Sequence, residues 1–237
     1  MSARLRKIID HFGGASPVIL AVGLLIIASA WFFVELADEV VEGDSRQFDE
    51  WVLQSLRDPA DPAMPRGPTW LKLIMADITA LGGVAVLCIM TTAVVGYMLM
   101  TRKFAAIALI LGATIGGVLV GSVLKQQFAR PRPSVVPHLT EVLTHSFPSG
   151  HSMYSAIVYL TLGALLTRLT PGWREKIYLI VVALGIIFLI GISRIYLGVH
   201  YPTDVLAGWT AGLAWALLCW LVARYLQRKG AVEKEDE

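Results

Sequence analysis

The sequence predicts an all-α membrane protein, a polytopic bundle of six transmembrane helices with an outer amphipathic segment between the first two. Of the 237 residues, 56% are hydrophobic and only 16% are charged, which is too apolar for a soluble domain. Charge-free stretches recur, each close to the ~20 residues that a helix needs to cross a bilayer core of ~30 Å. They cover residues 12–34, 78–101, 104–124, 152–167, 177–193 and 205–223. We expect one domain over residues 1–228 and a charged cytoplasmic tail over residues 229–237.

The distribution of lysine and arginine predicts the orientation, because cytoplasmic segments carry an excess of both. If the N-terminus lies inside, the basic residues Arg102, Lys103, Arg174 and Lys176 fall in inner segments. The first outer loop, residues 35–72, is instead rich in acidic residues. We therefore expect a cytoplasmic (inner) membrane protein with both termini in the cytoplasm. The net charge of +2 is too small to suggest nucleic-acid binding.

The N-terminal segment permits a second interpretation. Arg4, Arg6 and Lys7 precede an apolar run, as in a secretory signal peptide. Within that run, Ala28–Ser29–Ala30 has the small residues of a cleavage site. The apolar run continues through Val34 and completes a full span, so a retained helix is the favoured interpretation.

The outer loop between the first two spans contains Trp51, Leu53 and Leu56 among charged residues and prolines. This pattern is typical of a short amphipathic helix that lies on the membrane surface. We expect such a helix over about Ser45 to Arg57. A loop packed over the ends of the spanning helices fits the same residues equally well.

The third span carries a row of small residues, Gly112, Gly116, Gly117 and Gly121. In membranes, small residues at four-residue spacing allow the backbones of two helices to approach closely. The row therefore predicts tight helix packing within the bundle, with dimerisation as the weaker alternative.

Three clusters of polar residues lie at the ends of the apolar runs, all on the predicted outer side. They comprise Lys125 with Arg132–Pro133, Pro148–Ser149–Gly150–His151, and Ser193–Arg194 with His200 and Asp204. Together they supply three cations, two imidazoles and one carboxylate. Phosphoryl transfer needs this set: cations for the phosphoryl oxygens, a nucleophile with an orienting carboxylate, and an acid for the leaving group.

The first two clusters each have an ordinary structural explanation. Lys125 and Arg132 could extend from a helix end toward the membrane surface, and Arg130 between them is expected to be an exposed positive charge. Ser149 and Gly150 stand where a helix begins, and free backbone N–H groups at a helix N-terminus attract anions. An ordinary capped helix start would have the same residues.

The third cluster has a more specific geometry. Asp204 lies four residues after His200, so its carboxylate can accept the Nδ1–H bond and leave Nε2 free as a nucleophile. A structural histidine–aspartate pair at a helix cap is the simple alternative. Because three independent coincidences would not all fall on one side of the bilayer, the clusters together favour a phosphate site.

The three clusters resemble the complete signature of the type 2 phosphatidic acid phosphatase (PAP2) superfamily, which includes lipid phosphate phosphatases, glucose-6-phosphatase and vanadium haloperoxidases. Every motif position is present, in order and with the family spacing, over residues 125–204. The six-span layout also resembles the membrane members. The motif register of the family selects Arg132 rather than Arg130. The matching motifs are Lys125-x6-Arg132–Pro133, Pro148–Ser149–Gly150–His151 and Ser193–Arg194-x5-His200-x3-Asp204.

The resemblance implies a role for each residue. His200 would attack phosphorus and form a phosphohistidine, Asp204 would orient it, and His151 would protonate the departing lipid oxygen. The expected phosphate-binding groups are Lys125, Arg132, Ser149, Gly150 and Arg194. No metal and no cofactor are expected, because three cations can stabilise the phosphoryl charge.

The resulting expectation is a lipid phosphate or diphosphate phosphatase at the outer (periplasmic or extracellular) face of the membrane. The compact form resembles bacterial members, which favours undecaprenyl diphosphate, phosphatidylglycerol phosphate or phosphatidate as substrate. A lipid-to-lipid phosphotransferase is the alternative enzyme. A lipid transporter or non-catalytic lipid-binding protein is disfavoured, since no motif residue is lost and no charge interrupts the six runs. The oligomeric state stays open.

Overall fold

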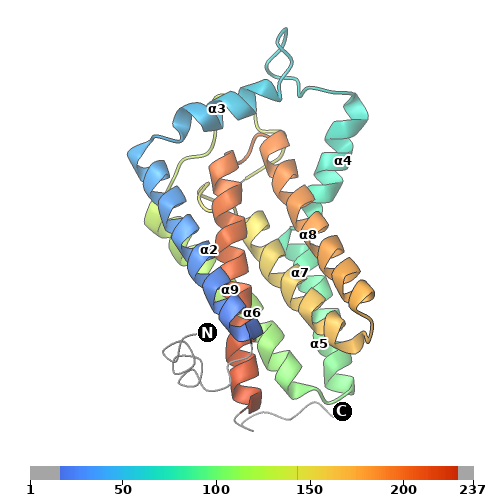
Figure 1. Cartoon of the computed structure of the whole chain (residues 1–237). Coiled ribbons are helices and arrows are strands. Elements are labelled where there is room, and N and C mark those ends of the chain that lie inside the picture. Colours follow the sequence, from blue (N-terminus) through green and yellow to red (C-terminus); the bar gives the residue numbers. More distant parts are fainter. Residues whose placement is uncertain (1–16, 143, 229–237) are drawn as a thin grey trace.

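The computed structural model describes residues 17–142 and 144–228, and every regular element in these ranges is an α-helix. The helices form an elongated bundle with one short helix across its end (Figure 1). In chain order they are α2 (Pro17–Glu42), α3 (Arg46–Ser55), α4 (Thr69–Ala80), α5 (Val84–Met100), α6 (Phe104–Phe128), α7 (Gly150–Leu169), α8 (Trp173–Tyr196) and α9 (Pro202–Arg228). The all-α prediction is confirmed for the part of the chain that the structure describes.

Four of these helices, α2, α6, α8 and α9, are long and apolar enough to cross a membrane by themselves. The expected second span, residues 78–101, is not one straight helix. It is a bent pair in which α4 and α5 meet at 44° across a short break. The break contains Gly82 and Gly83, and two adjacent glycines weaken a helix because they lack side chains and gain backbone freedom.

Helix α7 lies inside the bundle, in contact with α6, α8 and α9. Its polar residues Ser152, Ser155 and Thr161 are buried among neighbouring helices and do not face lipid. Helix α9 approaches α7 closely through two glycines. A Cβ on Gly208 would lie 2.7 Å from the Ser149 carbonyl oxygen, and one on Gly212 would lie 2.6 Å from the Met153 carbonyl oxygen. This contact fixes how the N-terminal ends of α7 and α9 lie against each other.

The glycine row of α6 packs as expected at three of its four positions. A Cβ on Gly116 would lie 2.5 Å from the Trp215 ring, and one on Gly121 would lie 2.7 Å from the Tyr154 hydroxyl. Gly117 faces Ile157 equally tightly. A Cβ on Gly112 would meet nothing within 4 Å.

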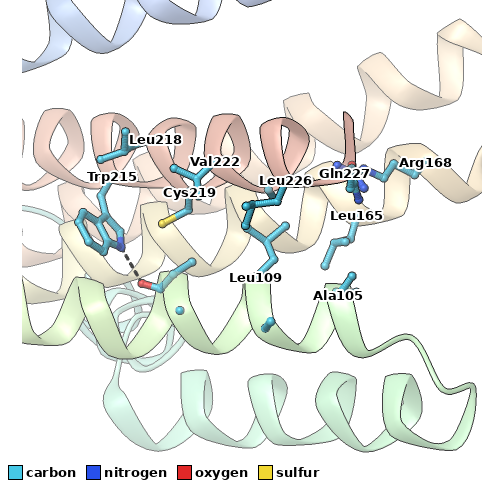
Figure 2. A pocket seen from close by; sticks show the side chains of 15 residues that line it. Ala105, Leu109, Leu165, Arg168, Trp215, Leu218, Cys219, Val222, Leu226 and Gln227 are labelled. Carbon is cyan, nitrogen blue, oxygen red and sulfur yellow. Dashed lines mark hydrogen bonds between the residues drawn. The ribbon is translucent and has the colours of Figure 1, made fainter. Parts of the chain in front are cut away.

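Gly112 instead lines a cavity of about 300 Å³ between α6, α7 and α9. Figure 2 shows apolar side chains of these helices turned toward one another around it, with Leu109 on α6 and Val222 on α9. Trp215 bounds one side, and its indole N–H donates to the Ala113 carbonyl oxygen at 2.8 Å. The cavity lies toward the start of α6, whereas Lys125 lies in the last turn of that helix.

The outer loop contains a helix, α3, which matches the expectation over Ser45 to Arg57. Helix α3 lies across the end of the bundle and contacts α9 (Figure 1). Its Leu53 is fully buried, whereas Phe48 and Trp51 on another side are more than half exposed. The segment is therefore both a helix and a cover over helix ends; its position at the membrane surface stays a prediction.

The two ends of the chain are only partly described. Helix α2 runs without interruption through Ala28–Ser29–Ala30. The basic residues Arg4, Arg6 and Lys7 of the possible signal peptide lie outside the described residues, as does the charged tail over residues 229–237.

The glycine packing makes a prediction with an internal control. Gly116→Ala forces a methyl group against the Trp215 ring, which its hydrogen bond to Ala113 holds in place, so we expect a loss of about 1–3 kcal/mol. Gly112→Ala adds the same methyl group in open space and gains helix propensity, up to ~1 kcal/mol. Melting temperatures in detergent should fall for Gly116→Ala and stay level or rise for Gly112→Ala. Equal losses would contradict the packing.

Candidate active site

The three motif clusters meet at one end of the bundle, at the end of α6 and the beginnings of α7 and α9. Backbone hydrogen bonds join the segments that carry them. Ser146 N–H donates to the Arg130 carbonyl oxygen at 2.9 Å, and Ser149 N–H donates to the Asp204 carbonyl oxygen at 2.9 Å. The first hydrogen bond joins the beginning and the end of the α6–α7 loop. The second joins the end of this loop to the first turn of α9.

The turn between α8 and α9 places His200. Helix α8 ends at Tyr196, and Gly198 adopts φ +73, a left-handed conformation that glycine reaches without a steric penalty. Pro202 begins α9, where its missing N–H costs no helical hydrogen bond. His200 lies between these points and is only 1% exposed.

His200 and Asp204 form the expected pair. Nδ1 of His200 lies 3.2 Å from Oδ2 of Asp204, and Nε2 lies 3.2 Å from the Arg132 guanidinium. The carboxylate bond on Nδ1 orients the ring so that Nε2 points toward the cations. This is the orientation that a nucleophilic imidazole requires.

Asp204 is fully buried and has further donors. Its Oδ2 accepts from the Ser146 hydroxyl and, at 2.9 Å, from the Tyr201 N–H. Its Oδ1 accepts from Arg130 at 2.6 Å. A carboxylate with this many donors stays ionised, because hydrogen bonds to the charged form stabilise it.

Arg130 differs from the expectation of an exposed positive charge. Its side chain is only 12% exposed and forms ion pairs with Asp49, at 2.8 Å, and Asp204, at 2.6 Å. Its guanidinium also lies over the Tyr201 ring, 4.2 Å from the ring centre. Two buried carboxylates draw this arginine inward, and neither contact is visible in the local sequence around Arg130.

The three predicted phosphate-binding cations bond neutral oxygen atoms. Lys125 Nζ donates to the His145 carbonyl oxygen at 2.6 Å, and Arg132 Nε donates to the Thr144 carbonyl oxygen at 2.7 Å. Arg194, 3% exposed at the end of α8, donates to the Thr79 hydroxyl at 3.0 Å. Their charges remain available to an anion.

His151 and the start of α7 complete the cluster. His151 lies within electrostatic range of Arg194, Arg132 and Lys125, so one region contains all three cations and both histidines. Ser149 is the N-cap of α7, and its hydroxyl oxygen accepts from the Ser152 N–H at 3.5 Å. A Cβ on Gly150 would lie 3.5 Å from Lys125 Cε. The structure thus brings every predicted site residue to the same end of the bundle.

The environment of His200 favours its neutral form. Burial lowers the pKa of this imidazole to about 3, outweighing the opposing attraction of Asp204, while Arg132 and Arg194 lower it further. A neutral imidazole keeps a lone pair on Nε2, which nucleophilic attack on phosphorus requires.

Sequence reasoning missed several polar residues that hold this site. Ser146 bonds Asp204, Thr79 of α4 bonds Arg194, and Thr203 bonds both Arg130 and Asp49. Only Ser146 and Thr203 lie near a motif in the sequence. Nothing in the sequence around Thr79 or Asp49 connects either residue with the clusters.

Comparison with known proteins finds phosphatases among the relatives of this chain. Phosphatidylglycerophosphatase B of Bacillus subtilis is 38% identical over 145 residues, which are 61% of this chain and 71% of that protein. An undecaprenyl-diphosphatase of Sulfolobus acidocaldarius is 37% identical over 119 residues, which are 47% of this chain and 52% of that protein. Among solved structures, a transmembrane PAP2-type phosphatidylglycerolphosphate phosphatase from Bacillus subtilis aligns with a TM-score of 0.77 and 30% identity, over 86% of this chain and 98% of that chain.

The family assignment rests on the region that contains all three clusters. The model of the PAP2 superfamily matches residues 105–228, about half of the chain, and this range includes the site from Lys125 to Asp204. The fold, the motif residues and their arrangement agree with that match. The chain therefore belongs to the PAP2 superfamily, and it is a phosphatase.

Proposed function

We propose that the protein is a metal-independent lipid phosphatase that acts through a phosphohistidine on His200, at the outer face of the cytoplasmic membrane. One observation carries the proposal. His200 is held by Asp204 on Nδ1, and its Nε2 faces Arg132 within a cluster of cations. This arrangement suits in-line attack on a phosphoryl group whose oxygens are held by those cations.

The proposed reaction uses the roles that the family resemblance implies for the two histidines. His200 Nε2 forms a bond to phosphorus while the bond from phosphorus to the lipid oxygen breaks. His151, protonated beside the bound phosphate dianion, gives its proton to the departing oxygen. His151 then takes a proton from water, which attacks phosphorus, breaks the bond to Nε2 and releases inorganic phosphate.

The cations would hold the phosphoryl group throughout. Phosphoryl oxygens would replace the carbonyl oxygens of Thr144 and His145 as acceptors for Arg132 and Lys125. Arg194 would add its charge from the end of α8. The hydroxyl of Ser149 and the backbone N–H of Gly150 at the start of α7 would donate to the same anion.

The proposed arrangement in the membrane has six spans, in which α4 and α5 form one broken span and α7 is the span enclosed by the others. Helix α3 would lie at the outer surface and expose Phe48 and Trp51 to the interface. The inner segments carry Arg102, Lys103, Arg174 and Lys176, which supports cytoplasmic termini. The motif clusters would then face the periplasm or the cell exterior.

The substrate class follows from this position and from the relatives. A phosphate site at the end of a membrane bundle is accessible to the headgroup of a lipid whose chains stay in the bilayer. The relatives include two proteins named phosphatidylglycerophosphatase B and two named undecaprenyl-diphosphatase. The phosphatidylglycerophosphatase B of Bacillus subtilis aligns with 61% of this chain, against 47% for the undecaprenyl-diphosphatase of Sulfolobus acidocaldarius. We therefore propose phosphatidylglycerol phosphate as the first candidate substrate, followed by undecaprenyl diphosphate and phosphatidate.

Replacement of the nucleophile gives the central prediction. His200→Ala should reduce phosphate release by about a thousandfold or more, because no nitrogen remains to accept the phosphoryl group. His138→Ala is the control, since His138 bonds the Pro133 carbonyl oxygen in the same loop and has no proposed role. Chelators should leave the wild-type rate unchanged. The two variants and the effect of chelators are all tested by measuring free phosphate released from a detergent-solubilised lipid substrate.

The covalent step is tested by rapid quenching with substrate labelled in the phosphate. The wild-type protein should carry label that is stable in base and lost in acid, and His200→Ala should carry none. Full activity in His200→Ala, or wild-type turnover without labelled protein, would overturn the phosphohistidine.

The substrate proposal predicts an order of rates. Phosphatidylglycerol phosphate, undecaprenyl diphosphate, phosphatidate and a water-soluble phosphate ester are compared at equal concentration by phosphate release. We expect the lipids to be hydrolysed faster than the soluble ester, with phosphatidylglycerol phosphate fastest. A soluble ester that matched the lipids would contradict the lipid assignment, and label transferred to an acceptor lipid would indicate a phosphotransferase.

The neutral state of His200 predicts a pH dependence of stability. Between its unfolded pKa of 6.5 and its folded pKa of about 3, the unfolded chain binds a proton that the folded protein does not. Stability should therefore fall as the pH decreases through this window, by at most about 1.4 kcal/mol per pH unit. The drop in melting temperature from about pH 7.5 to about pH 5 should be smaller in His200→Asn than in the wild type. Equal drops would contradict a neutral His200.

A further inference from the structure

A buried carboxylate outside the three motif clusters reaches the site from the outer helix. Asp49 of α3 is fully buried, although it lies in an acid-rich loop. Its oxygens accept from the Thr203 N–H at 3.1 Å, from the Thr203 hydroxyl at 2.6 Å and from Arg130 at 2.8 Å. Burial of a charge is expensive unless it is paired, so these bonds are what allow Asp49 to lie there.

Arg130 extends this contact to the proposed catalytic pair. One terminal nitrogen bonds Asp49, and the other bonds Oδ1 of Asp204 at 2.6 Å. Oδ2 of the same carboxylate accepts from His200. The bond to Oδ1 therefore limits rotation of the Asp204 carboxylate and keeps Oδ2 directed at the imidazole.

The charges of Asp49, Arg130 and Asp204 also matter to the reaction. Asp49, Arg130 and Asp204 together carry a net charge of −1, next to an imidazole that becomes positive when it is phosphorylated. If Asp49 were neutral, the full charge of Arg130 would act on Asp204 and reduce its ability to stabilise that positive charge. If Arg130 were neutral, two buried carboxylates would lack their shared partner.

We infer that Asp49 and Arg130 are positioning residues that hold Asp204, and through it His200, in the orientation for phosphoryl transfer. The outer helix α3 thereby completes the active site, although it carries no motif residue. The inference rests on the proposed roles of His200 and Asp204. It assigns to α3 a function beyond covering the helix ends.

The test uses three variants and one matched control. Asp49→Asn removes one charge with little change in shape. Arg130→Gln removes the cation that bonds both Asp49 and Asp204, and the double variant removes both charges. Glu50→Gln is the control, because Glu50 is the neighbouring acid on α3 and pairs with the exposed Arg46 at 2.8 Å. Each purified protein is measured for kcat, KM and melting temperature with the same lipid phosphate.

We expect kcat to fall by about tenfold to a hundredfold in Asp49→Asn and Arg130→Gln, the effect of losing one charge-assisted hydrogen bond. KM should stay within about twofold, since Lys125, Arg132 and Arg194 still bind the phosphate. The control should match the wild type in all three measurements.

The double variant separates positioning from stabilisation of the fold. Arg130→Gln leaves Asp49 buried without its cation and should lower the melting temperature most, whereas the double variant removes that unpaired charge and should regain part of the loss. Its kcat should stay low, because Asp204 still lacks its bond on Oδ1. Recovery of kcat together with the melting temperature would overturn the inference, and so would an unchanged kcat in Asp49→Asn.

His200→Ala is measured in parallel to keep the two proposals distinguishable. Activity retained in His200→Ala would overturn the phosphohistidine itself. An inactive His200→Ala with unchanged kcat in Asp49→Asn and in the double variant would overturn only the positioning role. If Arg130→Gln fails to fold, these two variants still decide between the outcomes.

Discussion

The buried carboxylate of Asp204 is the interaction on which the rest of the site depends. An unpaired charge in this position would cost several kcal/mol, so its donors must all be in place in the folded protein. These donors come from different parts of the chain: Ser146 and Arg130 from the α6–α7 loop, and His200 and Tyr201 from the α8–α9 turn. The backbone carbonyl oxygen of Asp204 also accepts from Ser149. The segments that carry the three motif clusters therefore meet around one residue.

The bundle supports this convergence through backbone contact between α7 and α9. Gly208 and Gly212 of α9 lie directly against the carbonyl oxygens of the N-cap and the first turn of α7, so the two helix ends cannot shift independently. The backbone hydrogen bond from Ser149 to Asp204 depends on this close approach of the two helix ends. Tight packing near the catalytic end and a cavity near the other end coexist in the same three helices. The closest helix packing thus lies at the end of the bundle where the motif clusters meet.

The sequence predicts the parts of this molecule that depend on local pattern. Charge-free runs indicate the spans because the bilayer sets their length. The motif spacing identifies His200 and Asp204 because a separation of four residues lets the carboxylate reach Nδ1. The bend at Gly82 and Gly83 is missed because a glycine pair within an apolar run interrupts neither its length nor its composition. Arg130 is misjudged because its two carboxylates lie 74 and 81 residues away along the chain. Among many acidic residues of the outer loop, the sequence does not mark Asp49 as buried.

The contacts of the basic residues explain why their roles differ. Arg130 bonds two carboxylates, so its charge is already compensated within the protein. Lys125, Arg132 and Arg194 bond carbonyl or hydroxyl oxygens, which leave the positive charge in place. A phosphate dianion that replaces a carbonyl oxygen adds the attraction between opposite charges to a hydrogen bond whose donor is already ionised. In the proposed site, selectivity for phosphate would therefore depend on the cations that have no carboxylate partner among the described residues, as much as on the number of cations.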